Sequence, residues 1–277
     1  MQVAGISIDR FMPSHLADAV RLSRQAGWPH RLEDWQLALA LSEGVVALDE
    51  LGDVVGTCLL TRYDGCATVN MVIVDETMRG RGVGKRLMDS VLVLAGDMPL
   101  RLVATMEGLP LYEKLGFVRT GSIVQHQGEA VATTATDSTE DATEVDLPAI
   151  AALDRIAFGA DRNALIKRLA GLGPFAIVRR GGKVVGFSAM RSFGRGEVIG
   201  PVTAATPEDA EALILHFMSR RPGRFLRIDT GADTGLAPWL SARGLAHVGG
   251  GIVMARPPAT RPAASATVFA LANQALG

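Results

Sequence analysis

The chain has 277 residues, and its 28 Lys and Arg nearly balance its 29 Asp and Glu, which gives a formal net charge of -1 at pH 7. This length is enough for two domains of ordinary size, and the balanced charge gives no reason to expect a nucleic acid partner. No apolar run reaches the roughly 18 residues of a membrane-spanning helix. Asp9 and Arg10 interrupt the N-terminus before a signal-peptide core could form, so we expect a cytoplasmic protein.

The first half of the chain alternates between helix and strand patterns. Amphipathic spacing predicts the helices, and short apolar or alternating segments predict the strands. In chain order we expect a strand at Ile6–Arg10, helices at Pro13–Ala26 and Leu32–Leu41, strands at Gly44–Leu48, Val54–Thr61 and Ala67–Val74, a helix at Gly82–Ala95, a strand at Leu100–Ala104, a helix at Leu109–Leu115 and a strand at Val118–His126. This order predicts an α/β fold with a mixed sheet.

A glycine-rich turn joins the predicted strand at Ala67–Val74 to the helix that follows it. Its sequence is RGRGVGK, residues 79–85. Glycine main-chain N–H groups can close around phosphate oxygens, and the positive end of the helix dipole lies beneath them. The turn is not a Walker A loop, because Arg79 and Arg86 occupy places that need Gly and Ser or Thr. The Rossmann pattern fails as well, since Lys85 or Leu87 stands where its last glycine is required.

The pattern that remains, Arg-Gly-x-Gly-x-Gly after an apolar strand, resembles motif A of the GNAT superfamily of acyl-CoA-dependent N-acyltransferases. Further along, PLYEKLGF at Pro110–Phe117 resembles motif B of the same family, a short helix that carries a tyrosine. Both motifs occur in the family's order, which strengthens the resemblance. The alternative is a solvated turn at residues 79–84 and a core aromatic at Tyr112.

The second half repeats the pattern of the first at an offset of about 130 residues, which predicts tandem copies of one fold. The matching pairs of segments are Ser14–Leu22 with Val145–Leu153, Asp53–Leu60 with Lys183–Met190, and Leu115–Ser122 with Arg243–Gly250. We therefore expect a catalytic GNAT domain at 1–128, a linker at 129–142, a degenerate GNAT-like domain at 143–257 and a C-terminal tail at 258–277, each domain having a mixed, mostly antiparallel twisted sheet flanked by helices.

The second copy lacks the chemistry of the first. TAATPEDA, residues 203–210, stands where the first copy has its glycine turn, and Leu240 matches Tyr112. Glu208 and Asp209 would stabilise a helix N-terminus but repel a pyrophosphate. Two roles are then open for the second copy. It covers or extends the acceptor site, or it only buries an exposed sheet face.

The resemblance implies roles for individual residues. Acetyl-CoA would be the acyl-donor cosubstrate, and main-chain groups of the strand end would polarise the thioester while the glycine turn holds the pyrophosphate. Tyr112 matches the family tyrosine that protonates the departing thiolate, and Thr105 stands where many members have Asn against the cofactor. The implied cofactor-binding residues are Val72, Ile73, Val74, Arg79, Gly80, Arg81, Gly82, Val83, Gly84 and Lys85.

The general base is less constrained, because family members use different residues or only ordered water. His30 is our first candidate, in the helical region that lines the acceptor pocket in the family, and Asp34 and His126 are alternatives. Trp28 and Trp35 either build an apolar wall for the acceptor or pack in the core.

The predicted activity is transfer of an acetyl group from acetyl-CoA to the amine of a small molecule by direct attack in a ternary complex. The alternative from another class is a non-catalytic acyl-CoA sensor. No His or Cys cluster has metal-ligand spacing, and the two cysteines, Cys58 and Cys66, are expected to be core thiols. A homodimer is left open.

Overall fold

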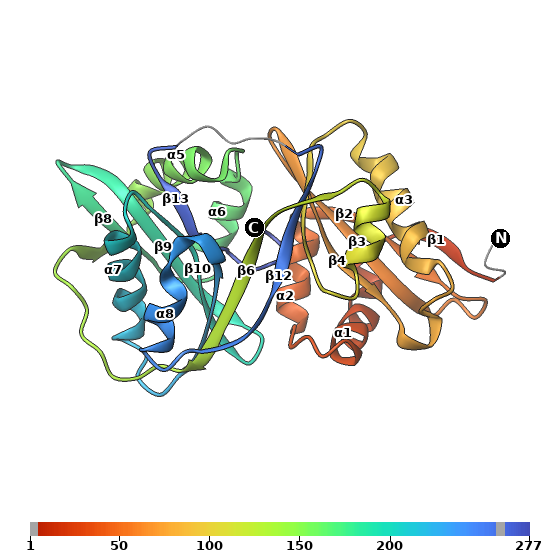
Figure 1. Ribbon diagram of the computed structural model, residues 1–277, viewed down its shortest axis with the longest axis horizontal. Coiled ribbons are helices and arrows are strands. Elements are labelled where there is room, and N and C mark those ends of the chain that lie inside the picture. The colour runs from red at the N-terminus through yellow and green to blue at the C-terminus, as the bar shows by residue number, and fades with distance from the viewer. Residues whose placement is uncertain (1–4, 259–263) are drawn as a thin grey trace.

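The structure, a computed structural model, describes residues 5–258 and 264–277 and has two lobes side by side (Figure 1). The predicted elements of the first half are confirmed in type and order, with helix α1 preceded by a 3-10 turn at Pro13–His15. They are β1 (Ser7–Arg10), α1 (Leu16–Gln25), α2 (Leu32–Ala40), β2 (Ser42–Leu48), β3 (Val54–Tyr63), β4 (Cys66–Val74), α3 (Val83–Ala95), β5 (Leu100–Ala104), α4 (Leu109–Lys114) and β6 (Val118–Glu129).

The second half follows the same order, as its repeats predict. Its elements are β7 (Thr139–Asp141), α5 (Leu147–Phe158), α6 (Asn163–Ala170), β8 (Phe175–Arg180), β9 (Lys183–Phe193), β10 (Gly196–Ala204), α7 (Pro207–Met218), β11 (Phe225–Gly231), α8 (Leu236–Ser241), β12 (Ala246–Arg256) and β13 (Thr267–Ala270). The three repeated segments fall on α1 and α5, β3 and β9, and β6 and β12. The predicted linker contains β7, and the predicted tail contains β13.

The strands form one sheet of 13 strands in the order β1-β2-β3-β4-β5-β12-β6-β11-β13-β10-β9-β8-β7. The two halves exchange their corresponding strands, since β12 from the second half lies between β5 and β6 of the first. In Figure 1, β6 and β12 cross the centre of the molecule where the two lobes meet. The exchange joins the halves through main-chain hydrogen bonds, which fixes the second half against the first.

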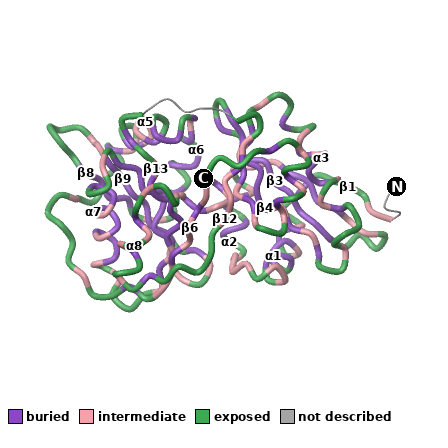
Figure 2. The backbone as a smooth tube through the Cα atoms, in the orientation of Figure 1, coloured by how far each residue is buried: buried purple, intermediate pink, exposed green. Residues whose placement is uncertain are grey.

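Helices cover both faces of the sheet. On β3, Cys58 and Leu60 belong to the core under α3, whereas Leu59 belongs to the core under α1, because side chains alternate along a strand. The buried residues in Figure 2 accordingly follow the sheet and the inner faces of the helices. Full burial of a residue such as Leu59 stabilises the fold by about 1.5–3 kcal/mol. Both cysteines are buried core residues, as expected.

Two pairs of neighbouring strands run parallel, one in each half, and both diverge. In the first half β4 and β5 pair only at Ala67 with Leu100 and at Thr68 with Arg101, so the rest of the β4 edge is unpaired by β5. In the second half β10 and β11 likewise pair at two positions, but β13 inserts beyond them and bonds to both strands. Only the first of the two gaps therefore stays open for a ligand.

Candidate functional site

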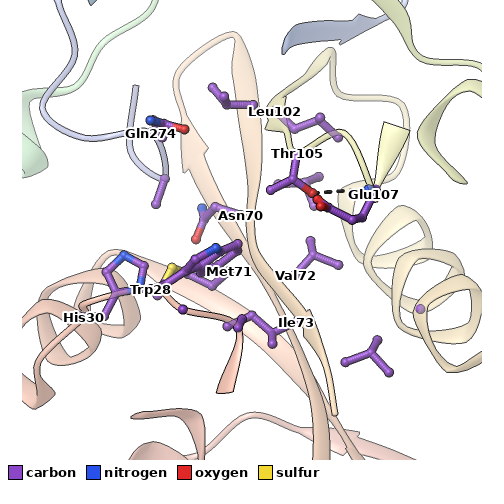
Figure 3. Close-up of a pocket in the computed structure, with 18 of the residues that line it drawn as sticks. Trp28, His30, Asn70, Met71, Val72, Ile73, Leu102, Thr105, Glu107 and Gln274 are labelled. Atoms are coloured by element: carbon purple, nitrogen blue, oxygen red, sulfur yellow. Dashed lines mark hydrogen bonds between the residues drawn. The ribbon is translucent and has the colours of Figure 1, made fainter. Parts of the chain in front are cut away.

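A cavity of about 690 Å³ opens where β4 and β5 diverge. Its wall comes from the α1–α2 connection, β4, the glycine turn, β5, α4 and the C-terminal segment. Figure 3 shows Trp28 and His30 on one side of β4 and Thr105 and Glu107 on the other. The cavity thus has two ends, one at the first two helices and one at the strand-to-helix corner, and we name them the acceptor end and the cofactor end.

The backbone of β4 is distorted inside the cavity. Met71 is the one non-glycine residue with a positive φ in the described chain, at 50°, and its carbonyl accepts a hydrogen bond from Thr57 Oγ1 at 2.7 Å. The ladder with β3 resumes beyond this bulge, because Asp75 N–H donates to Val55 O at 2.9 Å. Since main-chain groups alternate along a strand, those of Val72 and Val74 face the unpaired edge, whereas Ile73 pairs with Thr57.

The glycine turn delivers free main-chain N–H groups at the cofactor end. Gly82 precedes the first helical residue of α3 and has φ of 83°, which only glycine adopts without strain. Arg86 N–H donates to Gly82 O at 3.1 Å as the first intrahelical bond. The N–H groups before Arg86 therefore have no helical acceptor, and no acidic residue stands in the first turn of α3.

The predicted cofactor residues divide into two groups. Arg79, Gly80, Gly82, Val83 and Gly84 line the cavity, as do the three strand residues 72–74. Arg81 and Lys85 are absent from the cavity wall as far as the structure describes it, and the Lys85 ammonium pairs with Asp89 Oδ2 at 2.6 Å on the helix surface. Those two residues thus lie beside the corner, with their side chains outside its wall.

Tyr112 of α4 stands at the boundary between core and cavity. It is 7% exposed, lines the cavity, and packs its ring edge-on against Phe117. Burial raises the pKa of its phenol far above the usual value, so the hydroxyl stays protonated at neutral pH and can donate. A Cβ at Gly108 would lie 2.9 Å from the Tyr112 ring, so the glycine leaves the space that the ring occupies.

His30 lines the acceptor end, where aromatic rings surround it. Its ring centroid is 5.6 Å from those of Trp28 and Phe193, and its Nδ1 lies 3.3 Å from Ser23 Oγ. Burial lowers the pKa of His30 to about 4; the charge of Asp34 opposes this shift, and the charges of Arg227 and Arg191 add to it. His30 is therefore neutral at pH 7.

A stability prediction follows from this shift. With an ordinary pKa of about 6.5 when unfolded, His30 binds a proton more readily in the unfolded chain. Folding is therefore weakened as pH falls from 6.5 to about 4, by on the order of 3 kcal/mol in total. In urea titrations at pH 7 and pH 4, His30→Gln should lose clearly less unfolding free energy than the wild type. Equal losses in the two proteins would contradict the lowered pKa.

The other candidate bases are not available at the cavity. Asp34 accepts bonds from Arg31 and from the Gly194 main-chain N–H at 3.0 Å. Burial alone would raise the pKa of Asp34, but these bonds bring it below its usual value, so the carboxylate joins α2 to the second half. His126 is buried within β6, away from the described cavity wall. Trp35 packs in the core and donates to Ser23 Oγ at 2.9 Å, whereas Trp28 lines the cavity.

The corresponding corner of the second half is closed. Thr206 Oγ1 accepts from Asp209 N–H at 3.2 Å and caps α7, and the Asp209 carboxylate takes two bonds from Arg180 at 2.6 and 2.7 Å. Thr206 thus takes a helix N–H group that a pyrophosphate would need, and the Asp209 carboxylate puts negative charge at the same helix end. With β13 in the neighbouring gap, the second half retains neither part of a CoA site.

Several cavity residues lie outside the sequence prediction. Asn70 precedes the bulge, and its buried Oδ1 has no hydrogen-bond partner among the described residues. Arg227 and Gln274 come from the second half and the C-terminal segment, respectively. No motif marks any of them: Asn70 lies within β4 itself, whereas Arg227 and Gln274 reach the cavity only through the strand exchange and the return of the chain after β13.

Within residues 5–258 and 264–277, no three His, Cys, Asp or Glu side chains are grouped so as to hold a metal ion. The same residues include no helix with the length and apolar character to span a membrane.

Comparison with known families assigns both halves. A family model described as an acetyltransferase (GNAT) domain matches residues 150–270, and another with the same description matches residues 41–119. A curated protein of Bacillus subtilis (strain 168), named uncharacterized N-acetyltransferase YitH, is 28% identical over 223 residues, which are 78% of each chain.

Solved structures share the fold over nearly the whole chain. A putative acetyltransferase from Pyrococcus horikoshii superposes with a TM-score of 0.85 at 19% identity, covering 100% of this chain and 98% of its own. A tandem GNAT protein from the clavulanic acid biosynthesis pathway gives 0.63 at 13% identity, covering 92% of this chain and 100% of its own. At these identities the likeness concerns the fold alone.

Proposed function

The chain belongs to the GNAT superfamily of N-acetyltransferases, with one family domain in each half, and we propose that its first half transfers the acetyl group of acetyl-CoA to a small-molecule amine. The observation that carries the proposal is the single open corner at β4, β5 and α3. There, unpaired main-chain groups of Val72 and Val74 adjoin the free N–H groups of a glycine turn.

In this proposal, different residues of the first half bind different parts of acetyl-CoA. The N–H groups of Gly82 to Gly84 hold the pyrophosphate, aided by the Arg79 guanidinium, and the edge of β4 pairs with the pantetheine arm. Bound there, acetyl-CoA supplies an activated thioester. The N–H of Val72 or Val74 polarises its carbonyl as negative charge develops on oxygen.

Attack by the amine lone pair forms the C–N bond, and collapse of the tetrahedral adduct breaks the C–S bond. Tyr112 then gives its proton to the departing sulfur; burial keeps its phenol protonated at neutral pH, so that the proton is present when the thiolate forms. The phenolate regains a proton from solvent.

In this proposal His30 does not remove a proton from an alkylammonium ion. Against an amine pKa of about 10.4, its pKa of about 4 makes that transfer unfavourable by about 9 kcal/mol. The amine therefore binds neutral after losing its proton to water. We propose that the imidazole accepts a hydrogen bond from the neutral amine and takes its proton as C–N bond formation makes the nitrogen acidic.

The test is release of free CoA thiol from acetyl-CoA, measured over a panel of amino acids, amino sugars, polyamines and peptides. At least one small amine should accelerate release about 100-fold or more above hydrolysis, with an N-acetylated product in the mass spectrum. Tight binding of acetyl-CoA without acetylation of any amine would instead support the sensor alternative.

A further inference from the structure

Arg227 of β11 is a charged side chain that the second half places at the acceptor end of the cavity. Its Cζ lies 5.0 Å from the ring centroid of Phe193, and the same ring is 5.6 Å from that of His30. The other charged residues of the described wall, Arg79 and Glu107, follow β4 and β5 at the cofactor end. Arg227 is therefore the charged residue of the described wall that would lie beside the reacting amine of a bound acceptor.

The Arg227 guanidinium is held with one nitrogen spare. Its Nε and Nη2 donate to the Asp229 carboxylate at 2.9 and 3.1 Å, and Gln274 Nε2 donates to the same carboxylate at 3.0 Å. Its Nη1 has no hydrogen bond recorded among the described residues, and the side chain is 11% exposed. A guanidinium that is already held on one side offers two N–H groups on the other side, and its side chain loses no further rotamer freedom when a ligand binds.

Three guanidinium groups and two buried carboxylates lie around Phe193, and the further carboxylate that acts on Arg31, that of Glu33, is exposed to solvent. Arg31 and Arg191 share Asp34, and Arg227 has Asp229. Arg191 is 4% exposed, its Cζ lies 4.9 Å from the Phe193 centroid, and its Nε and Nη2 have no partner among the described residues. His30 adds no negative charge. An uncompensated positive charge among buried side chains is unfavourable, so a bound ligand with one negative charge would be stabilised there.

We propose that the acceptor carries a carboxylate beside its amine, and that Arg227 holds this carboxylate through Nη1 as the residue that determines acceptor specificity. The inference rests on the proposed function and narrows its substrate class to amino-acid-type amines. A carboxylate fits better than a phosphate because the excess charge is single and one nitrogen is spare. The second half thereby contributes to recognition without touching the acyl donor.

The experiment compares each of the twenty L-amino acids with its primary amide in the thiol-release assay. Amidation removes the carboxylate and keeps the amine, so the wild type should acetylate its preferred acid with kcat/KM about 100-fold above the matching amide, chiefly through KM. In Arg227→Gln the acid should lose this advantage and the amide should be little changed. Arg195→Gln is the matched control, because Arg195 also lies over a ring, 5.0 Å from that of Phe225, but is exposed.

Loss of Arg227 leaves the Asp229 carboxylate buried without its main partner, so the double variant R227Q/D229N is measured as well. It removes both charges and should show the same loss of acid preference, with calorimetric affinity for acetyl-CoA unchanged. Equal kcat/KM for acids and amides in the wild type, or acid preference retained in both variants, would overturn the inference and leave the proposed function standing. Failure of every amine, acids and amides alike, would refute the proposed function itself.

Discussion

Tyr112→Phe should lower kcat about 100-fold or more while the affinity for acetyl-CoA stays within about threefold of the wild type. General acid catalysis contributes roughly 10²–10⁴-fold to rates, and the phenol is the group proposed to protonate the thiolate. The ring that packs against Phe117 is kept in the variant, so the cavity keeps its shape. Single-turnover kinetics and calorimetry with acetyl-CoA measure the two quantities separately.

The other tyrosine of the chain is the matched control. Tyr63 donates its hydroxyl to Leu276 O at 2.7 Å in a buried contact away from the cavity wall. Tyr63→Phe should therefore cost about 1 kcal/mol of unfolding free energy and leave kcat unchanged. A kcat for Tyr112→Phe close to that of Tyr63→Phe would remove Tyr112 from the mechanism.

Gly82→Asp should weaken acetyl-CoA binding by at least about 100-fold. The substitution puts a carboxylate at the corner proposed to hold the pyrophosphate, where helix N–H groups otherwise face a negatively charged ligand. Calorimetry should find one acetyl-CoA per wild-type chain and none per variant chain, since β13, Thr206 and Asp209 close the corner of the second half.

The backbone cost of this substitution can be separated from its electrostatic effect. Gly52 lies in the turn between β2 and β3 with φ of 84°, almost the value of 83° at Gly82, and a Cβ there would meet nothing within 4 Å. Gly52→Asp should thus lose a similar 1–2 kcal/mol of stability for the left-handed conformation and bind acetyl-CoA normally. If Gly82→Asp bound acetyl-CoA with wild-type affinity, the corner at Gly82 would not be the cofactor site. A second acetyl-CoA site of equal affinity in the wild-type chain would likewise contradict the assignment.

Much of the first half follows from local patterns. Residues 79–84 predict a phosphate-binding corner because the N–H groups of glycines before an amphipathic helix can surround phosphate oxygens. The structure places Gly80, Gly82 and Gly84 in the cavity wall. The position of Tyr112 followed from its motif. The side chains of Arg81 and Lys85 could not be placed this way, because the direction of a long charged side chain depends on partners such as Asp89.

The candidate bases show where local patterns fail. His30 and Asp34 are both candidates in sequence, four residues apart just before and within α2, yet one lines the cavity and the other is bonded to Arg31 and Gly194. The pKa of His30 depends on burial and on charges from the distant β9 and β11, and that of Asp34 depends on burial, on Arg31 and on the Gly194 main-chain N–H. No spacing rule within the first half could supply those charges.

Local patterns in the amino-acid sequence were enough for the helices and strands of the first half, the tandem repeat and the glycine corner, but not for β7 or β13, since periodicity, turn chemistry and helix capping act between residues close together in the chain. Tertiary structure alone decided that β6 and β12 exchange places, that β13 closes the second gap, and that Arg227 and Gln274 reach the acceptor end. These outcomes depend on strand pairing and burial between residues from about 40 to well over 100 positions apart, which leave no periodic trace in either segment.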